Sequence, residues 1–251
     1  MKLYEIIDII ETAFPKEGAY DWDNVGLLVG DRDSEIKKAL LTLDITEATV
    51  REAIEKGCQL ILSHHPMMFS GIKQVTCDTA EGRIIISAIK NGINIYAAHT
   101  NCDVAPSGIN AYLAEIFDLE NAEFLEENGL GRIGQIKNPC SLGEFCKRVK
   151  SVLKLDFVRF CGDENKVIRT VAIGSGACSD AIPQAIEKGA DVMITGDTKY
   201  HNMLDFSKDI AVIDAGHYGT EIVVCDIFES LLKDCGLELV RTLAVDVYKL
   251  G

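Results

Sequence analysis

The sequence is poor in positive charge. It contains 25 lysine and arginine residues against 39 aspartate and glutamate residues, which gives a formal net charge of −14. Nucleic acids and anionic membranes are bound through clustered basic side chains, so this balance argues against both as partners. It still permits one local basic pocket for the phosphates of a nucleotide, and bound divalent cations would offset part of the negative charge.

Long apolar runs are also absent from the sequence. No uninterrupted apolar stretch approaches the roughly 20 residues that span a bilayer. The first ten residues carry acidic side chains within their apolar stretch. This pattern argues against a signal peptide and predicts an amphipathic first helix.

The cysteines lack a pairing pattern. There are nine of them, an odd number; no two form a C-x-x-C motif, and Cys58 and Cys225 lie within apolar runs. We interpret them as reduced thiols, mostly buried as small apolar side chains, in a cytoplasmic protein. Cys102 is expected to pack in the same way, with a role as a ligand or a redox-sensitive neighbour as the alternative.

One pentapeptide, AIEKG, occurs twice, at residues 53–57 and 185–189. The similarity extends to the apolar runs on either side, which are residues 39–44 and 60–65 around one copy and 170–175 and 192–197 around the other. Each copy predicts a strand, a helix, a second strand and a polar loop, with the glycine as the C-cap of the helix.

The repeat predicts an α/β fold made of two similar lobes, each a sheet flanked by helices. We expect the first lobe at residues 1–125 and the second at 126–251, with the C-terminal helix able to pack back on the first. Loops that follow parallel strands usually build the sites of such folds, so we expect the functional site in these loops.

Four of the five histidines lie in three short segments, each of which follows an apolar, strand-like run. The segments are residues 63–66 (SHHP), 99–103 (HTNCD) and 217–221 (HYGTE). Imidazoles and carboxylates that meet from several strand ends predict a divalent-metal site of mixed nitrogen and oxygen ligands. The number of ligands is sufficient for two ions, and zinc, iron or manganese would suit them.

Several ligand roles follow from spacing. His64 and His65 can diverge to two metals if they lie on a loop, and Pro66 fixes the backbone after them. Asp103 and Glu221 can each bridge two cations, or can cap the helices that follow them.

His217 and Glu221 have i, i+4 spacing, which places both side chains on one face of a helix. His99 has the same spacing to Asp103 and is expected as a ligand, as support for a ligand, or as a proton donor. His201, with Tyr200, is expected in substrate binding or acid–base catalysis, or else in a surface loop.

Two further segments have open interpretations. The turn around Trp22, the only tryptophan, is either structural or a wall of the cleft. The sequence Gly174-Ser175-Gly176 is similar to a phosphate-binding loop, but no P-loop Lys-Ser/Thr follows it.

Taken together, these motifs resemble the NGG-interacting-factor-three-like dinuclear metal-centre family, whose members are also named GTP cyclohydrolase I type 2. The residues that carry the resemblance are 22–27, 63–66, 99–103, 196–197, 200–201 and 216–221. The resemblance implies a two-lobed α/β subunit with two divalent metals in the cleft between the lobes, assembled as a toroidal homohexamer. The ligands it implies are His64, His65, Asp103, His217 and Glu221, with Glu221 as the bridge.

The function expected from the resemblance is metal-dependent hydrolysis of GTP. An activated water would attack C8 of the purine, and the products would be formate and dihydroneopterin triphosphate, with His99 or His201 moving protons. Because a two-metal site does not specify its substrate, hydrolysis of a phosphoester is an alternative. A metal-binding hexameric scaffold or regulator is the non-enzymatic alternative.

Overall fold

The protein is described by a computed structural model that covers residues 1–249, and the chain divides into two compact units. Unit 1 contains residues 1–102 together with the C-terminal segment that begins at Val224, and unit 2 contains residues 103–223. Within residues 1–249, no helix has the length and apolar character needed to cross a membrane.

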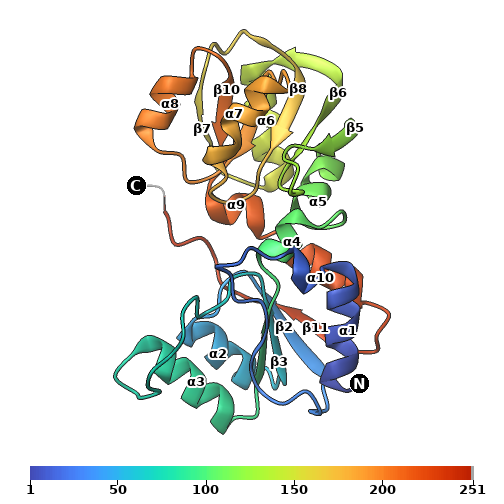
Figure 1. Cartoon of the computed structure of the whole chain (residues 1–251), viewed down its shortest axis with the longest axis vertical. Coiled ribbons are helices and arrows are strands. Elements are labelled where there is room, and N and C mark those ends of the chain that lie inside the picture. Colours follow the sequence, from blue (N-terminus) through green and yellow to red (C-terminus); the bar gives the residue numbers. More distant parts are fainter. Residues whose placement is uncertain (250–251) are drawn as a thin grey trace. The chain divides into compact units, whose positions relative to one another are not determined.

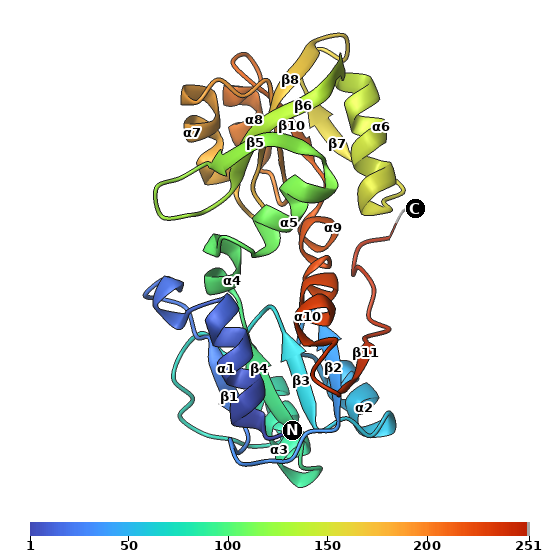
Figure 2. The same ribbon diagram turned by 90° about the vertical axis from the view of Figure 1, so that its right-hand side faces the viewer.

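Unit 1 is built on a five-stranded mixed sheet with the strand order β1-β4-β3-β2-β11 (Figures 1 and 2). Its strands are β1 (Gly26–Val29), β2 (Lys38–Thr42), β3 (Leu60–Ser63), β4 (Asn94–Ala97) and β11 (Glu238–Arg241). Strands β2, β3, β4 and β11 are parallel, and β1 pairs antiparallel with β4. The register pairs Ser63 with both Thr42 and Ala97, so β2, β3 and β4 end at the same edge of the sheet.

Helices cover both faces of this sheet (Figure 1). They are α1 (Leu3–Ala13), α2 (Glu47–Glu55), α3 (Ala80–Lys90) and α10 (Val224–Leu232). On one face, α2 and α3 enclose a buried apolar cluster around Leu40, Ile61 and Ile95. On the other face, α1 buries its apolar stripe as the first ten residues predicted, and its C-cap Phe14 lies 6.5 Å from the ring of Phe228 on α10.

Unit 2 is built on a six-stranded mixed sheet with the order β5-β6-β8-β9-β10-β7 (Figure 2). Its strands are β5 (Leu119–Phe124), β6 (Arg132–Ser141), β7 (Arg159–Cys161), β8 (Val167–Ile173), β9 (Val192–Thr195) and β10 (Ala211–Asp214). Strands β8, β9 and β10 are parallel, while β6 and β7 pair antiparallel with β8 and β10. The helices are α5 (Ile109–Ile116), α6 (Leu142–Leu153), α7 (Ile182–Glu187) and α8 (Tyr200–Phe206). Two short helices carry candidate site residues: α9 (His217–Glu221), and α4 (Thr100–Val104), which belongs to unit 2 only from Asp103 onward.

The structure confirms the α/β class and the repeated strand–helix–strand pattern. The helix of each AIEKG copy ends at a glycine in the left-handed region, Gly57 at φ 68° and Gly189 at φ 75°. The following residue then donates its backbone N–H to the alanine of the pentapeptide, at 2.8 Å in the first copy and 2.9 Å in the second. Both helices therefore end with the same glycine C-cap, as the sequence predicted.

A second shared device lies at the start of the parallel strands. Gln59 Oε1 accepts hydrogen bonds from the backbone N–H groups of residues 37–38, both at 3.0 Å. At the equivalent position in unit 2, Asp191 Oδ2 accepts from the backbone N–H groups of residues 169–170, at 2.8 and 2.9 Å. An amide and a carboxylate thus have the same role in the two copies, because each accepts hydrogen bonds from the backbone N–H groups just before the parallel pairing with β3 or β9 begins, at Ala39 in unit 1 and Val171 in unit 2.

The boundaries of the two units differ from those of the expected lobes, residues 1–125 and 126–251. The C-terminal segment belongs to unit 1 because β11 extends its sheet in parallel with β2, and Leu239 pairs with Ala39. Residues 103–125 belong to unit 2 because β5 pairs with β6. The repeat identifies the shared strands and helices, but it contains no information on which sheet the flanking elements join.

Candidate metal centre

Three imidazoles gather at the edge of the unit 1 sheet where the parallel strands end. His64 and His65 follow β3, and His99 follows β4. Their ring centroids are 5.0 to 5.3 Å apart, and one ring nitrogen of each lies within 4.8 Å of the others. His64 is fully buried, while the other two rings are partly exposed. The loop conformation after β3 lets adjacent histidines point to the same region, which an extended strand would prevent.

Each of these rings is oriented through its Nδ1 atom. His64 Nδ1 lies 2.8 Å from the carbonyl oxygen of Ala98, and His65 Nδ1 lies 2.7 Å from Asp44 Oδ1. His99 Nδ1 lies 2.9 Å from Asp23 Oδ1. Carbonyl and carboxylate oxygens only accept hydrogen bonds, so Nδ1 carries the proton and Nε2 becomes the coordinating nitrogen. Histidines that bind metals in proteins are usually held in this way.

Asp23 is a buried carboxylate that supports His99. Its side chain is 0% exposed, and Oδ2 accepts from the backbone N–H and the hydroxyl of Thr100 at 3.0 and 2.5 Å. Burial opposes ionisation of this carboxyl, but hydrogen bonds from His99 and Thr100 outweigh burial and hold its pKa well below its ordinary value. Asp23 is therefore ionised and fixes the orientation of the His99 ring.

The candidate residues of unit 2 lie on α4 and α9. His217 and Glu221 are one helical turn apart on α9, and His217 Nε2 lies 2.8 Å from Glu221 Oε2. Asp103 on α4 is buried, and one of its carboxylate oxygens lies within 4.8 Å of a Glu221 oxygen. The hydroxyl of Ser175 donates to Asp103 at 3.4 Å. One imidazole and two largely buried carboxylates therefore lie together in this unit. The i, i+4 spacing predicted the pairing of His217 with Glu221.

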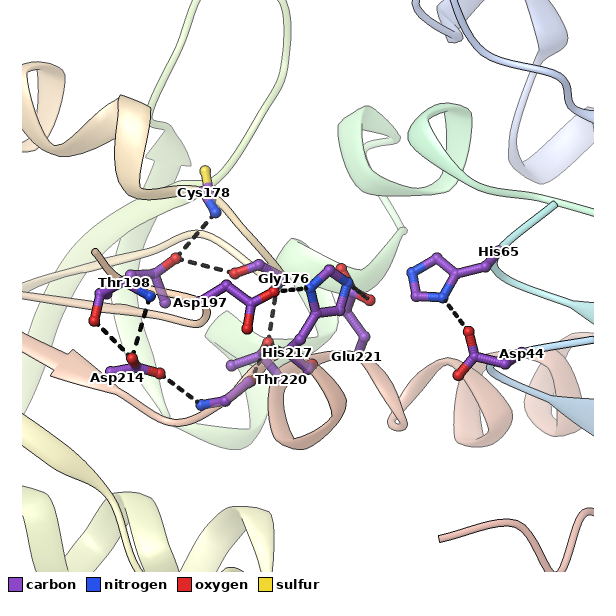
Figure 3. A network of polar contacts seen from close by, with 12 residues as sticks. Asp44, His65, Gly176, Cys178, Asp197, Thr198, Asp214, His217, Thr220 and Glu221 are labelled. Atoms are coloured by element: carbon purple, nitrogen blue, oxygen red, sulfur yellow. Dashed lines mark hydrogen bonds and ion pairs between the residues drawn. The ribbon is translucent and has the colours of Figure 1, made fainter. Parts of the chain in front are cut away.

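His217 has the same kind of support as the histidines of unit 1. Its Nδ1 lies 2.9 Å from Asp197 Oδ2 (Figure 3). Asp197 adopts φ 51° in the turn after β9, and the next residue, Thr198, donates its backbone N–H and hydroxyl to the buried Asp214 at 3.2 and 2.6 Å. Arg159 also pairs with Asp214. This network fixes the turn that places Asp197 against His217.

The loop 174–176 is shaped by its approach to Glu221. Gly176 has φ +59°, and a Cβ added there would lie 2.0 Å from Glu221 Oε1. Its backbone N–H donates to Thr220 Oγ1 at 2.9 Å. Close approach of the backbone to a site carboxylate therefore explains the glycine, without any need for a phosphate-binding role.

Asp103 and Glu221 are not structurally equivalent, although each lies four residues after a histidine. Ala98 donates to Ser63 and Ala215 donates to Thr195 at the same point in each sheet, with distances of 3.0 and 2.8 Å. This register aligns Asp103 with Thr220, one residue before Glu221. The copies share the His-x-x-x-acid spacing, but the second histidine begins one residue later relative to its strand.

Three further residues considered in the sequence analysis, His201, Cys102 and Trp22, are not among the proposed metal ligands. His201 is exposed on α8, and its ring lies 5.4 Å from that of Tyr200; a catalytic role for His201 stays a prediction. Cys102 is fully buried, in agreement with a packing role. Trp22 is exposed and lies edge-on to His99 at 5.9 Å, which favours the interpretation of its turn as a wall of the site.

The sequence interpretation assigned no role to the three carboxylates that orient the histidines. Asp44 and Asp197 each lie two residues beyond a parallel strand, in the loops where such folds build their sites. Their position after β2 and β9 is a signal that could have identified them. Asp23 lies in the segment 22–27 that carries part of the family resemblance, but its separation of 76 residues from His99 gave no sign that the two side chains pair.

Comparison with known protein families matches residues 1–249 to Duf34/NIF3 (NGG1p interacting factor 3). A relative from Clostridium acetobutylicum, named GTP cyclohydrolase 1 type 2 homolog, is 39% identical over 99% of this chain and 98% of its own length. A relative of the same name from Clostridium perfringens is 42% identical over 88% of this chain and 87% of its own.

Solved structures agree with this relationship. The hypothetical protein SA1388 of Staphylococcus aureus has a TM-score of 0.91 at 30% identity and covers 100% of this chain and 99% of its own. Reduced HcgD from Methanocaldococcus jannaschii has a TM-score of 0.86 at 33% identity, with 97% of this chain and 98% of its own covered. The fold, the gathered histidines and carboxylates, and the match along nearly the whole sequence agree, and the chain belongs to the Duf34/NIF3 family.

Proposed function

We propose that this protein is a hydrolase that uses two divalent metal ions, and that its reaction is of the GTP cyclohydrolase type. In this reaction GTP and water yield formate and dihydroneopterin triphosphate. The observation that carries the metal proposal is the shared support of the imidazoles: His64, His65 and His217 all have Nδ1 occupied by a carbonyl or carboxylate oxygen. Such support prepares Nε2 for coordination.

The ligands in this proposal are His64, His65, Asp103, His217 and Glu221, with Glu221 as the bridge between the ions. Imidazole nitrogens and carboxylate oxygens form a donor set that suits zinc, iron and manganese. Within unit 1, ring nitrogens of His64, His65 and His99 lie within 4.8 Å of one another, and within unit 2 His217 Nε2 lies 2.8 Å from Glu221 Oε2; both groupings support this choice. Bound ions would supply Lewis acidity and lower the pKa of water.

The side chains of the protein have separate tasks in this reaction. Asp44 and Asp197 hold the Nδ1 protons of His65 and His217 and so keep both rings in place. His99, with its Nδ1 held by the ionised Asp23, can take a proton at Nε2 and return it as the purine ring opens. This arrangement of a base and an orienting carboxylate is common in acid–base catalysis.

The substrate proposal rests on the relatives named GTP cyclohydrolase 1 type 2 homolog. The same metals would also serve hydrolysis of a phosphoester, and we keep this as the second enzymatic candidate. Nucleotides are the substrates to test first, because both candidates accept them.

We further propose that the protein works in the cytoplasm as a toroidal homohexamer, as expected of its family. Four apolar side chains near the C-terminus, Leu243, Val245, Val247 and Tyr248, are 72–87% exposed. Exposed apolar side chains in one segment are typical of surfaces that become buried in an assembly. If the assembly alone is the function, the protein is a metal-binding scaffold, which binds metal without turnover.

Elemental analysis of the purified protein, followed by a GTP assay on the same sample, tests these proposals. About two ions per chain with metal-dependent release of formate supports the cyclohydrolase proposal. Two ions without formate from GTP, but with release of phosphate from a nucleoside monophosphate assayed in parallel, supports the phosphoester hydrolase. Failure to bind metal after reconstitution with zinc, iron(II) or manganese would refute the metal centre.

A further inference from the structure

Three aromatic side chains of unit 1, Tyr20, Trp22 and Phe69, form a continuous surface that we call the aromatic wall. The rings of Trp22 and Phe69 lie 6.1 Å apart with an angle of 41°, and those of Tyr20 and Trp22 lie 5.8 Å apart with an angle of 48°. Trp22 is 58% exposed and Phe69 is 54% exposed. Large aromatic side chains are usually buried, so two adjacent rings with open surface require an explanation.

The aromatic wall lies directly beside the histidines. The His99 ring is 5.9 Å from Trp22 and 5.8 Å from Phe69, and both aromatic rings meet it edge-on. His99 in turn lies 5.1 Å from His64 and 5.3 Å from His65. A ligand on the aromatic wall would therefore lie next to the imidazole that we propose moves protons.

Hydrogen bonds hold the aromatic wall in place from two sides. The backbone N–H of Tyr20 donates to the hydroxyl of Thr100 at 3.0 Å, and that hydroxyl donates to the buried Asp23. Asn24 Nδ2 donates to the carbonyl of Met68 at 2.7 Å and so holds the segment that carries Phe69. The sequence Trp22-Asp23-Asn24 thus supplies one ring, orients His99 and positions the second ring, which makes the wall a preorganised surface.

We propose that the aromatic wall binds the planar ring of a fused heteroaromatic ligand, of the purine or pteridine class, by stacking, and places that ring beside His99. Stacking of a base on aromatic side chains is favourable for any planar ring, because each ring presents a π-face. The wall presents three aromatic rings with neighbouring centroids 5.8 and 6.1 Å apart. This inference rests on the proposed function and adds the subsite that recognises the ring of the substrate.

The sole tryptophan of the chain gives a direct test, because Trp22 lies in the wall. Tryptophan emission is recorded from metal-loaded protein during titration with guanosine, with pterin, with ribose 5-phosphate and with inorganic tripolyphosphate. We expect saturable quenching by guanosine and pterin and none by ribose 5-phosphate or tripolyphosphate. Absence of saturable quenching by both ring compounds would overturn the proposal.

Substitutions then locate the subsite. Phe69→Ala is expected to weaken guanosine binding about tenfold or more, and Phe69→Tyr is expected to preserve it, because a stacked ring contributes at least this much to base binding. Phe157→Ala is the matched control, since Phe157 is half-exposed in unit 2. Equal affinities for Phe69→Ala and the parent protein would refute the assignment. Emission that depends on protein concentration and not on ring compounds would also refute it, because Trp22 would then contact a second copy.

Failure of the proposed function is distinguishable from failure of this inference. If guanosine quenches Trp22 but GTP yields no formate, the subsite stands and the cyclohydrolase reaction is refuted. If formate is released and Phe69→Ala leaves the KM for GTP unchanged, the reaction stands and the aromatic wall is refuted as its ring subsite. The metal content of Phe69→Ala and of the control Phe157→Ala is expected to equal that of the parent protein.

Discussion

Substitution of Gly176 by alanine should displace the carboxylate that we propose bridges the metals. Two costs add at this position. The backbone has φ +59°, and an L-residue in the left-handed region costs about 1–2 kcal/mol. The new Cβ would also lie 2.0 Å from Glu221 Oε1, so the carboxylate has to move by about 1 Å or more to reach an ordinary contact distance.

Gly189→Ala separates the two costs. Gly189 has φ +75°, and a Cβ there would meet no atom within 4 Å. Both variants should therefore lose about 1–2 kcal/mol of unfolding free energy from the backbone. Only Gly176→Ala should also disturb the metal site, because metal–ligand distances tolerate changes of about 0.2 Å.

The assay has two parts. Thermal unfolding of both variants should show a decrease of roughly 2–4 °C for each kcal/mol lost in a chain of this size. Elemental analysis after dialysis against a weak chelator should show metal loss in Gly176→Ala, with affinity reduced about 10–100-fold, and full metal content in Gly189→Ala. Equal metal affinity in the two variants would refute the reasoning that Gly176 makes room for Glu221.

Three further predictions test the site and the thiols. His65→Ala and Glu221→Ala should each lose metal in elemental analysis while circular dichroism stays unchanged; stoichiometric metal in both variants would contradict the ligand assignment. Asp197→Asn keeps a residue that tolerates the left-handed turn but weakens the acceptor for His217 Nδ1, so metal affinity should fall about 10–100-fold with little change in thermal stability. A metal titration measures this, and unchanged affinity would show that Asp197 does not support the ligand. Among the thiols, the exposed Cys77 should react with a thiol reagent at pH 8. Burial raises the pKa of Cys178 to about 12, so its thiolate should become available only on unfolding. Mass spectrometry of the labelled peptides measures both reactions, and labelling of Cys178 in the folded protein would contradict its burial.

Local patterns in the sequence were sufficient to predict the parallel core of each unit. The AIEKG copies and their apolar flanks marked β2, α2 and β3 and their counterparts β8, α7 and β9, because burial on both faces requires continuous apolar runs. The outer strands could not be assigned in this way. The pairing of β11 with β2 joins Glu238 to Lys38, and no pattern within either strand reveals a partner that far away in the sequence.

For the site, the sequence likewise predicted the local motifs but not the pairs of residues that tertiary packing brings together. The three histidine segments stand out because imidazole and carboxylate side chains recur at fixed spacing after strands. The atoms that orient them could not be read from spacing: His65 and Asp44 are separated by 21 residues, and His99 and Asp23 by 76. The order of strands in the sheet brings these pairs together, and it depends on tertiary packing.

The position of α10 and β11 has a consequence for the synthesis of the chain. All residues of unit 2 precede these two elements, which complete the sheet and one helical layer of unit 1. Domains generally fold as units while the ribosome is still elongating the chain. Unit 2 can therefore fold before unit 1 is complete. During that time residues 1–102 have been synthesised, but the edge of β2 lacks β11 and the face beside Phe14 lacks α10.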